Sequence, residues 1–259
     1  MSGLLGCGNM VNVKNQSLEA FSSYMGGGMS GGGNLTEITT IDNEVFLTVS
    51  ESELWYEDNR ITEYKVDKAA LEDIEAVFRK YKMNTWNGKK FTNIFVADGP
   101  NEGYTFKFND GAYVSFSSQI YPERYAEKLN EINDIVNKYR ATGVIQPGLV
   151  VTERTAEEMQ KIFHPDNGMI EIGIYEYSKD RILYRIMNGT GDEIDIPEQV
   201  KIVDKDGNII CERNGNYGFH VYPGYASEES IKINTRLEEG IYTLYVAEYS
   251  CEFEIKLPE

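Results

Sequence analysis

The spacing of the apolar residues changes near residue 168, from mixed helical and strand-like periods to strict alternation. Before that point, two sets of residues recur every three or four positions, which is typical of amphipathic helices. The first set is Leu71, Ile74, Val77, Phe78 and Tyr81. The second set is Tyr125, Leu129, Ile132, Val136 and Tyr139. Asp67 and Pro122 precede these sets, each at a position where a helix can begin.

Strand-like segments surround the two predicted helices. Residues 45–50, 61–66 and 91–96 are short runs rich in apolar and β-branched side chains. Residues 104–108 and 112–116 alternate on either side of Asp110-Gly111, a pair that favours a tight hairpin turn. The pattern therefore predicts an α+β domain over residues 37–142, an antiparallel sheet with two packed helices.

Residues 169–257 alternate with a period of two and contain about eight candidate strands, the spacing expected of a sandwich. A second Asp-Gly turn, at Gly207, joins two of these strands. Tyr242 follows Leu237 and Gly240 in the pattern of a tyrosine corner, in which the phenol bonds back to the preceding loop. We expect an all-β immunoglobulin-like sandwich over residues 169–259.

The remaining segments are predicted to connect or tether. Residues 1–36 contain two triple-glycine runs and no sustained period, which indicates a flexible tether. Residues 143–168 are predicted to be a linker with one short helix, because Thr155 and Glu158 have the spacing of a capping box.

Charge and cysteine content narrow the classes of partner. The formal net charge is −17, without a basic stripe, so binding to nucleic acid or to an anionic membrane surface is disfavoured. Three cysteines cannot form a disulfide framework. Cys251 shares a face with Phe253 and Ile255 and is expected in the core, and a bridge to Cys211 is left open.

No motif in the chain indicates catalysis or metal binding. His164 and His220 lack the local spacing of a zinc site, and no nucleophile motif accompanies either. The segment 204–208 superficially resembles a calcium loop, but its glycine is misplaced, so we expect a hairpin turn. We predict no catalytic residues, no metal ligands and no cofactor.

Aromatic residues are the remaining candidates for a binding site. Tyr217, Phe219, Tyr222 and Tyr225 lie in Gly-rich segments of the predicted sandwich, and Trp86 lies in the α+β domain. Exposed rings of this kind form stacking or protein-binding surfaces. The alternative is that these rings belong to the cores, and it stays open for each of them.

The C-terminal part resembles the bacterial immunoglobulin-like domains of secreted and cell-surface proteins, through residues 184–194, 203–209 and 237–242. This resemblance transfers no binding or catalytic residue. The middle part is similar to uncharacterised lipoproteins of anaerobic gut-type bacteria, through residues 86–88, 109–111 and 121–122. It implies an envelope location and no known activity.

Residues 4–7 resemble a bacterial lipobox, which would make Cys7 a lipidation site. Only six residues precede Cys7, whereas a signal peptide needs a basic region and about 7–15 apolar residues. An accidental match therefore remains the alternative.

These patterns together favour a non-catalytic binding or scaffolding protein of the cell envelope or extracellular space. Its partner would be a protein or glycan at the cell surface, and it would touch a membrane only through a lipid anchor at Cys7. One alternative is an extracellular hydrolase or inhibitor that acts through the α+β domain. Another is a cytoplasmic accessory protein.

Overall fold

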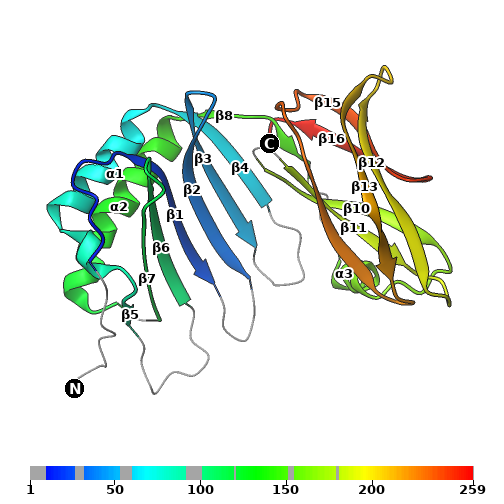
Figure 1. Ribbon diagram of the computed structural model, residues 1–259, viewed down its shortest axis with the longest axis horizontal. Helices are drawn as coiled ribbons and strands as arrows, with labels where there is room; N and C mark the ends of the chain where they lie inside the picture. Colours follow the sequence, from blue (N-terminus) through cyan, green and yellow to red (C-terminus); the bar gives the residue numbers. More distant parts are fainter. Residues whose placement is uncertain are drawn as a thin grey trace. The chain divides into compact units, whose positions relative to one another are not determined.

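The computed structural model describes residues 10–26, 32–52, 60–91, 101–119, 121–150, 155–178 and 181–258. The chain divides into two compact units, residues 1–55 with 62–146 and residues 56–61 with 147–259. The described residues are mostly β-strand and form three sheets, with helices beside them (Figure 1). The prediction of a β-rich chain that includes a β-sandwich is therefore confirmed.

The first unit is built on one eight-stranded sheet in the order β5-β7-β6-β1-β2-β3-β4-β8. Strand β5 lies parallel to β7, whereas β7, β6, β1, β2 and β3 follow one another antiparallel. The strands are β1 (Leu18–Gly26), β2 (Gly33–Ile41), β3 (Glu44–Ser52), β4 (Arg60–Val66), β5 (Lys90–Phe91), β6 (Asn101–Phe108), β7 (Tyr113–Ser118) and β8 (Val144–Ile145).

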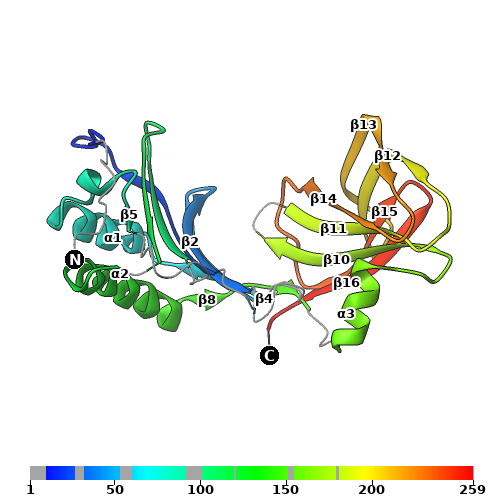
Figure 2. The same ribbon diagram turned by 90° about the horizontal axis from the view of Figure 1, so that it is seen from below.

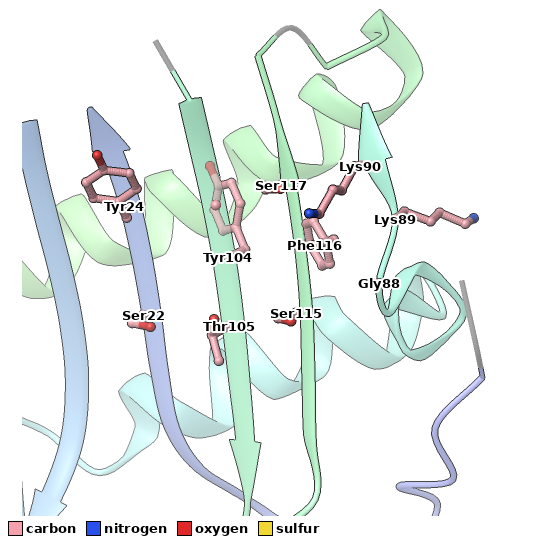
Figure 3. Close-up of a pocket in the computed structure, with 11 residues that line it drawn as sticks. Ser22, Tyr24, Gly88, Lys89, Lys90, Tyr104, Thr105, Ser115, Phe116 and Ser117 are labelled. Carbon is pink, nitrogen blue, oxygen red and sulfur yellow. The ribbon is translucent and has the colours of Figure 1, made fainter. Parts of the chain in front are cut away.

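Two helices cover one face of this sheet, α1 (Ala69–Lys80) and α2 (Glu123–Thr142), as Figures 1 and 3 show. Every residue of the two predicted apolar stripes is buried except Tyr81, which is half-buried. A short 3-10 helix (Met83–Trp86) follows α1. Within the described residues, no helix is both long and apolar enough to span a bilayer.

The predicted Asp-Gly hairpin joins β6 to β7. Gly111 has φ of +84°, a conformation that glycine adopts without a steric penalty. The Phe108 N–H donates to the Ala112 carbonyl at 2.8 Å, and the Ala112 N–H donates to the Asp110 carboxylate at 2.9 Å. Alternation then buries Tyr104, Phe106 and Phe108 on the helix-covered face.

The predicted tether over residues 1–36 is wrong for its described part. Residues 18–26 form β1, which pairs with β2 on one side and β6 on the other. Phe21 is 1% exposed, and the Leu18 N–H donates to the carboxylate of Glu75 in α1 at 2.8 Å. Ordering a Gly-rich segment costs conformational entropy, which we expected to keep this segment flexible. Burial of apolar side chains and strand pairing offset that cost.

The second unit is a two-sheet sandwich. One sheet has the order β10-β11-β14 and the other β13-β12-β15-β16-β9, and they face each other (Figure 2). The strands are β9 (Gly148–Leu149), β10 (Ile170–Ser178), β11 (Arg181–Asn188), β12 (Ile194–Asp204), β13 (Ile209–Val221), β14 (Ala226–Lys232), β15 (Gly240–Val246) and β16 (Tyr249–Lys256). Between residues 169 and 257 the described chain has seven strands, where about eight were predicted.

One core joins both sheets of the sandwich. Ile182 and Ile186 of β11 belong to the same buried cluster as Ile202 of β12 and Leu244 of β15. The phenol of Tyr242 donates to the carbonyl of Glu238 at 3.1 Å, as the tyrosine-corner pattern predicts. This bond fixes the chain where it enters β15.

The segment predicted as a linker is ordered where the structure describes it. Val144–Ile145 form β8 of the first unit, and Gly148–Leu149 form β9 of the second. The predicted short helix is α3 (Ala156–Phe163). Its capping box is confirmed: the Thr155 N–H donates to the Glu158 carboxylate at 2.8 Å, and the Glu158 N–H donates to Thr155 Oγ1 at 3.2 Å.

The register of the five-stranded sheet excludes a bridge between Cys211 and Cys251. Cys211 pairs with Ile202, Ile202 with Leu244, and Leu244 with Cys251. Three strand spacings of about 4.8 Å separate the two thiols, well beyond the reach of a disulfide. Cys251 is half-buried rather than buried as predicted. Burial raises the pKa of the Cys211 thiol, which disfavours the reactive thiolate.

The core of the sandwich contains a phenol without a hydrogen-bond partner. Tyr184 is 0% exposed, and its hydroxyl finds no partner among the described residues. We expect Tyr184→Phe to raise the free energy of unfolding by about 1 kcal/mol, because the buried hydroxyl carries a desolvation cost.

Urea denaturation would measure this change. Tyr242→Phe is the matched control, because it removes a phenol that does donate a bond and should lower the free energy of unfolding by about 1 kcal/mol. A loss of stability in Tyr184→Phe equal to that of the control would contradict the assignment.

Candidate functional site

The structure separates the predicted binding aromatics into two groups. Tyr217, Tyr222 and Tyr225 are exposed, at 83%, 54% and 61%. Phe219 and Trp86 are 7% and 4% exposed, so the prediction that they present rings to a partner is wrong. Both belong to core clusters. The predicted lipidation site Cys7 lies outside the described residues.

Trp86 is buried because other aromatic rings enclose it. Its ring centroid lies 5.1 Å from that of Phe116 and 4.7 Å from that of Tyr125, both in edge-on geometry. Such pairs add to the stability that burial itself provides. Phe219 faces inward from β13 because its exposed neighbours, Gly218 and His220, take the opposite face of the strand.

Tyr222 and Tyr225 are the ends of one tight turn. Pro223 precedes Gly224, which has φ of +73°, and the Tyr225 N–H donates to the Tyr222 carbonyl at 3.2 Å. Proline then glycine at the two central positions is the signature of a type II turn. The turn brings the two Cα atoms within about 7 Å, so both rings project from one loop.

Each ring of this turn contacts an imidazole. The ring of His220 lies 4.8 Å from that of Tyr222, and the ring of His164 lies 6.3 Å from that of Tyr225. His220 also contacts carboxylates, with Nδ1 2.9 Å from Asp195 Oδ1. We call His164, His220, Tyr222 and Tyr225 the aromatic loop cluster. Sequence spacing does not bring His164 to Tyr225, because the two residues lie 61 positions apart, whereas His220 lies only two positions from Tyr222.

One buried side chain holds these loops together. Asn188 is 0% exposed, and its Nδ2 donates to the carbonyls of Asp192 and Val221, each at 2.9 Å. Its Oδ1 accepts from Thr190 N–H at 3.0 Å and from Thr190 Oγ1 at 2.6 Å. The Asn188 backbone N–H donates to the Tyr225 carbonyl at 3.0 Å. Asn188 therefore joins the loop of residues 189–193 to both ends of the turn at residues 222–225.

Tyr217 lies apart from the cluster. It occupies a bulge of β13, where residues 215–217 lie opposite the single residue Glu198. The Glu198 side chain lies over Gly215, where an added Cβ would be 1.7 Å from its carboxylate oxygen, so a larger residue at 215 would displace this side chain. Tyr217 is five residues before Tyr222, roughly 15 Å along the strand. The structure therefore does not bring it to the other two tyrosines.

The first unit has a depression of about 290 Å³ on the sheet face that the helices leave open (Figure 3). Its floor is Gly103 of β6, which pairs with Tyr24 of β1 and Ser117 of β7. Ser117 pairs in turn with Lys90 of β5. A second row of three hydroxyl residues runs alongside, formed by Ser22, Thr105 and Ser115. We call this site the Gly103 depression.

The second unit has a larger cavity, of about 700 Å³, lined by α3, β10 and β16 among other segments. Arg185 lines it, but its guanidinium already stacks 4.1 Å from the Tyr175 ring, and its Nε lies 3.2 Å from Glu228. These contacts give Arg185 a structural role in its sheet.

The metal-ligating side chains of the described segments do not cluster. Within those segments, no group of three or more histidine, cysteine and acidic residues could hold a metal ion. Of the described residues that line the Gly103 depression, none carries a carboxylate.

The segment 204–208 is a hairpin turn as predicted, because Asp204 Oδ1 accepts the N–H of Asp206 at 2.9 Å and of Asn208 at 2.8 Å. The hydrogen bond from the Asn208 side chain lowers the pKa of Asp204.

Comparison with known proteins adds little. The chain matches no model of a known protein family and no curated protein. It is similar at 11% identity to a solved structure described as MHC-like MILL2, over 90% of this chain and 98% of that chain. The TM-score is 0.15, which is too low for this likeness to carry any argument.

Proposed function

We propose that this chain is a non-catalytic binding or scaffolding protein of the cell envelope, and that the aromatic loop cluster contacts the partner. The observation that carries the proposal is the exposure of Tyr222 and Tyr225 on a turn whose backbone is fixed by Asn188. Tyrosine supplies a large contact area with few rotatable bonds, so an already ordered turn loses little entropy on binding.

The domain assignment that supports this proposal is an α+β first unit and an immunoglobulin-like second unit. The strand orders β10-β11-β14 and β13-β12-β15-β16 support the immunoglobulin-like assignment of the sandwich, as does the Tyr242 bond to Glu238. Loops at one end of such a sandwich commonly form its binding surface. An envelope location, with Cys7 as a lipid anchor, belongs to the same proposal.

The electrostatic character of the cluster favours a neutral or basic partner. Asp195 and Glu193 flank His220 and are exposed, and the whole chain carries a net charge of −17. An anionic partner at this end would meet like charge. A glycan with hydroxyl groups or a basic protein surface fits both the rings and the carboxylates.

We expect the double variant Tyr222→Ala/Tyr225→Ala to bind its partner about 100-fold more weakly, because central tyrosines commonly contribute at least 2 kcal/mol to an interface. Saturation binding of the labelled protein to envelopes isolated from the bacterium that encodes it would measure this. Protease treatment or glycosidase treatment of the envelopes then separates a protein partner from a glycan.

Tyr113→Ala is the matched control, because Tyr113 is a tyrosine of the first unit and is 63% exposed. Its binding should equal that of the wild type. Equal binding by the double variant, or no saturable binding by the wild type, would refute the proposal.

A further inference from the structure

We infer that the Gly103 depression binds a carboxylated sugar, a hexuronate residue, at a site separate from the aromatic loop cluster. The inference does not depend on the function proposed above. It rests on the shape of the depression, on the hydroxyl groups around it, and on a local charge opposite to that of the chain.

The depression exists because Gly103 has no side chain. On this face Tyr24, Gly103, Ser117 and Lys90 stand side by side across four strands, so the missing side chain leaves a hollow between an aromatic ring and a lysine. Glycine weakens a strand interior and often marks a place where a ligand approaches the backbone closely. A volume of about 290 Å³ is at the lower end of the range for small-ligand sites, which suits one sugar ring.

The depression offers hydroxyl side chains for the hydroxyl groups of a sugar and an aromatic ring for its C–H face. Ser22, Thr105 and Ser115 form one row of hydroxyl residues, and Ser117 adds another. A hydroxyl both donates and accepts, so it can pair with any sugar hydroxyl. Two positions from Ser22 on β1, Tyr24 offers an aromatic ring that is 43% exposed, on which the C–H face of a sugar can pack.

The ring of Tyr24 is held in place by two glycines. A Cβ at Gly26 would lie 2.6 Å from the Tyr24 hydroxyl, and a Cβ at Gly33 would lie 3.5 Å from its Cε2. Gly26 and Gly33 pair with each other across β1 and β2. Their lack of side chains lets the ring lie against the sheet, so the stacking surface is formed before a ligand arrives.

Charge complementarity selects an acidic sugar. Among the described lining residues the charged side chains are Lys89 and Lys90, in a chain whose net charge is −17. Figure 3 shows Lys90 extending toward β7, whereas Lys89 points away. Lys89 Nζ lies 5.9 Å from the ring centroid of Tyr125 in α2. Lys90 is therefore the group that would pair with the carboxylate of a hexuronate.

Isothermal titration of the full chain with glucuronate tests the inference, with glucose and acetate as the neutral-sugar and anion-only probes. We expect glucuronate to bind with a Kd of about 1 mM and each other probe at least tenfold more weakly. Acetate binding as tightly as glucuronate would show a simple anion site and overturn the sugar assignment. No binding of glucuronate would overturn the whole inference.

Two variants locate the site. Gly103→Val should abolish glucuronate binding while the chain stays folded, because a Cβ there meets only Phe116 O and Ser117 Cβ, both at 3.8 Å. Lys90→Gln should weaken glucuronate binding about tenfold and leave glucose binding unchanged. Lys107→Gln is the charge control, since Lys107 is paired with Glu19 outside the depression, and it should bind glucuronate like the wild type.

Wild-type affinity in a folded Gly103→Val variant would overturn the site. The Tyr222→Ala/Tyr225→Ala variant should bind glucuronate normally, so failure here and failure of the proposed function are distinguishable.

Discussion

Phe21→Ala should lower the free energy of unfolding of the first unit by about 3–5 kcal/mol, the range for truncating a buried phenylalanine. Phe21 is 1% exposed, and its ring centroid lies 5.3 Å from that of Phe106 and 6.3 Å from that of Tyr104. Truncation would leave a cavity beside the rings of Tyr104 and Phe106, on the helix-covered face of the sheet, that these rings cannot fill without moving. A loss of this size is comparable to the whole stability of many small domains.

Denaturant unfolding followed by tryptophan fluorescence measures this loss, because Trp86 is buried in the same core. Met25→Ala is the matched control, since Met25 lies on the same strand but is 51% exposed, and it should change stability by less than about 0.5 kcal/mol. A tether over residues 1–36 would make both substitutions neutral. Equal, small effects of the two variants would therefore restore that prediction.

The predictions that hold depend on local signals. Signals between residues only a few positions apart predicted the helices α1 and α2, the turns at Gly111 and Gly207, and the Thr155 capping box. The tyrosine corner is similar, because Tyr242 bonds to a carbonyl four residues earlier. Short-range steric and hydrogen-bonding rules are enough to predict such features.

The prediction for β1 failed because its stability comes from distant residues. The triple-glycine runs indicated a segment with high conformational entropy and therefore a flexible tether. Phe21 nevertheless packs on Phe106, which is 85 positions later in the chain. Gly26 and Gly33 act as pairing partners whose missing side chains make room for Tyr24. Composition alone does not distinguish these glycines from those of a flexible linker.

The candidate sites likewise combine features that neighbouring residues determine with features that distant residues determine. Exposure of Tyr222 and Tyr225 follows from the Pro223-Gly224 turn, which can be read locally. The contact of His164 with Tyr225 requires two distant segments to meet, and the Gly103 depression requires the order of four strands. For Trp86 and Phe219 the sequence allowed either an exposed or a core position. Both side chains pack in the cores.

Asn188→Asp should lower the free energy of unfolding of the second unit by about 4 kcal/mol, because the substitution keeps the shape of the side chain and removes both donors. The carbonyls of Asp192 and Val221 would lose their hydrogen bonds. They would instead face a buried carboxylate at a position that is 0% exposed. Isolated charge and unsatisfied carbonyls both oppose folding, so the cost exceeds that of one lost bond.

Hydrogen exchange of backbone amides suits this test, because the second unit contains no tryptophan. Amides of residues 189–193 and 222–225 should lose protection most, since Asn188 joins these two loops. Asn216→Asp, at an exposed position of β13, makes the same chemical change and should leave protection unaltered. If Asn188→Asp also preserved protection in both loops, Asn188 would not be the residue that fixes the aromatic loop cluster. Tyr222 and Tyr225 would then need another source of the order that makes them a binding surface.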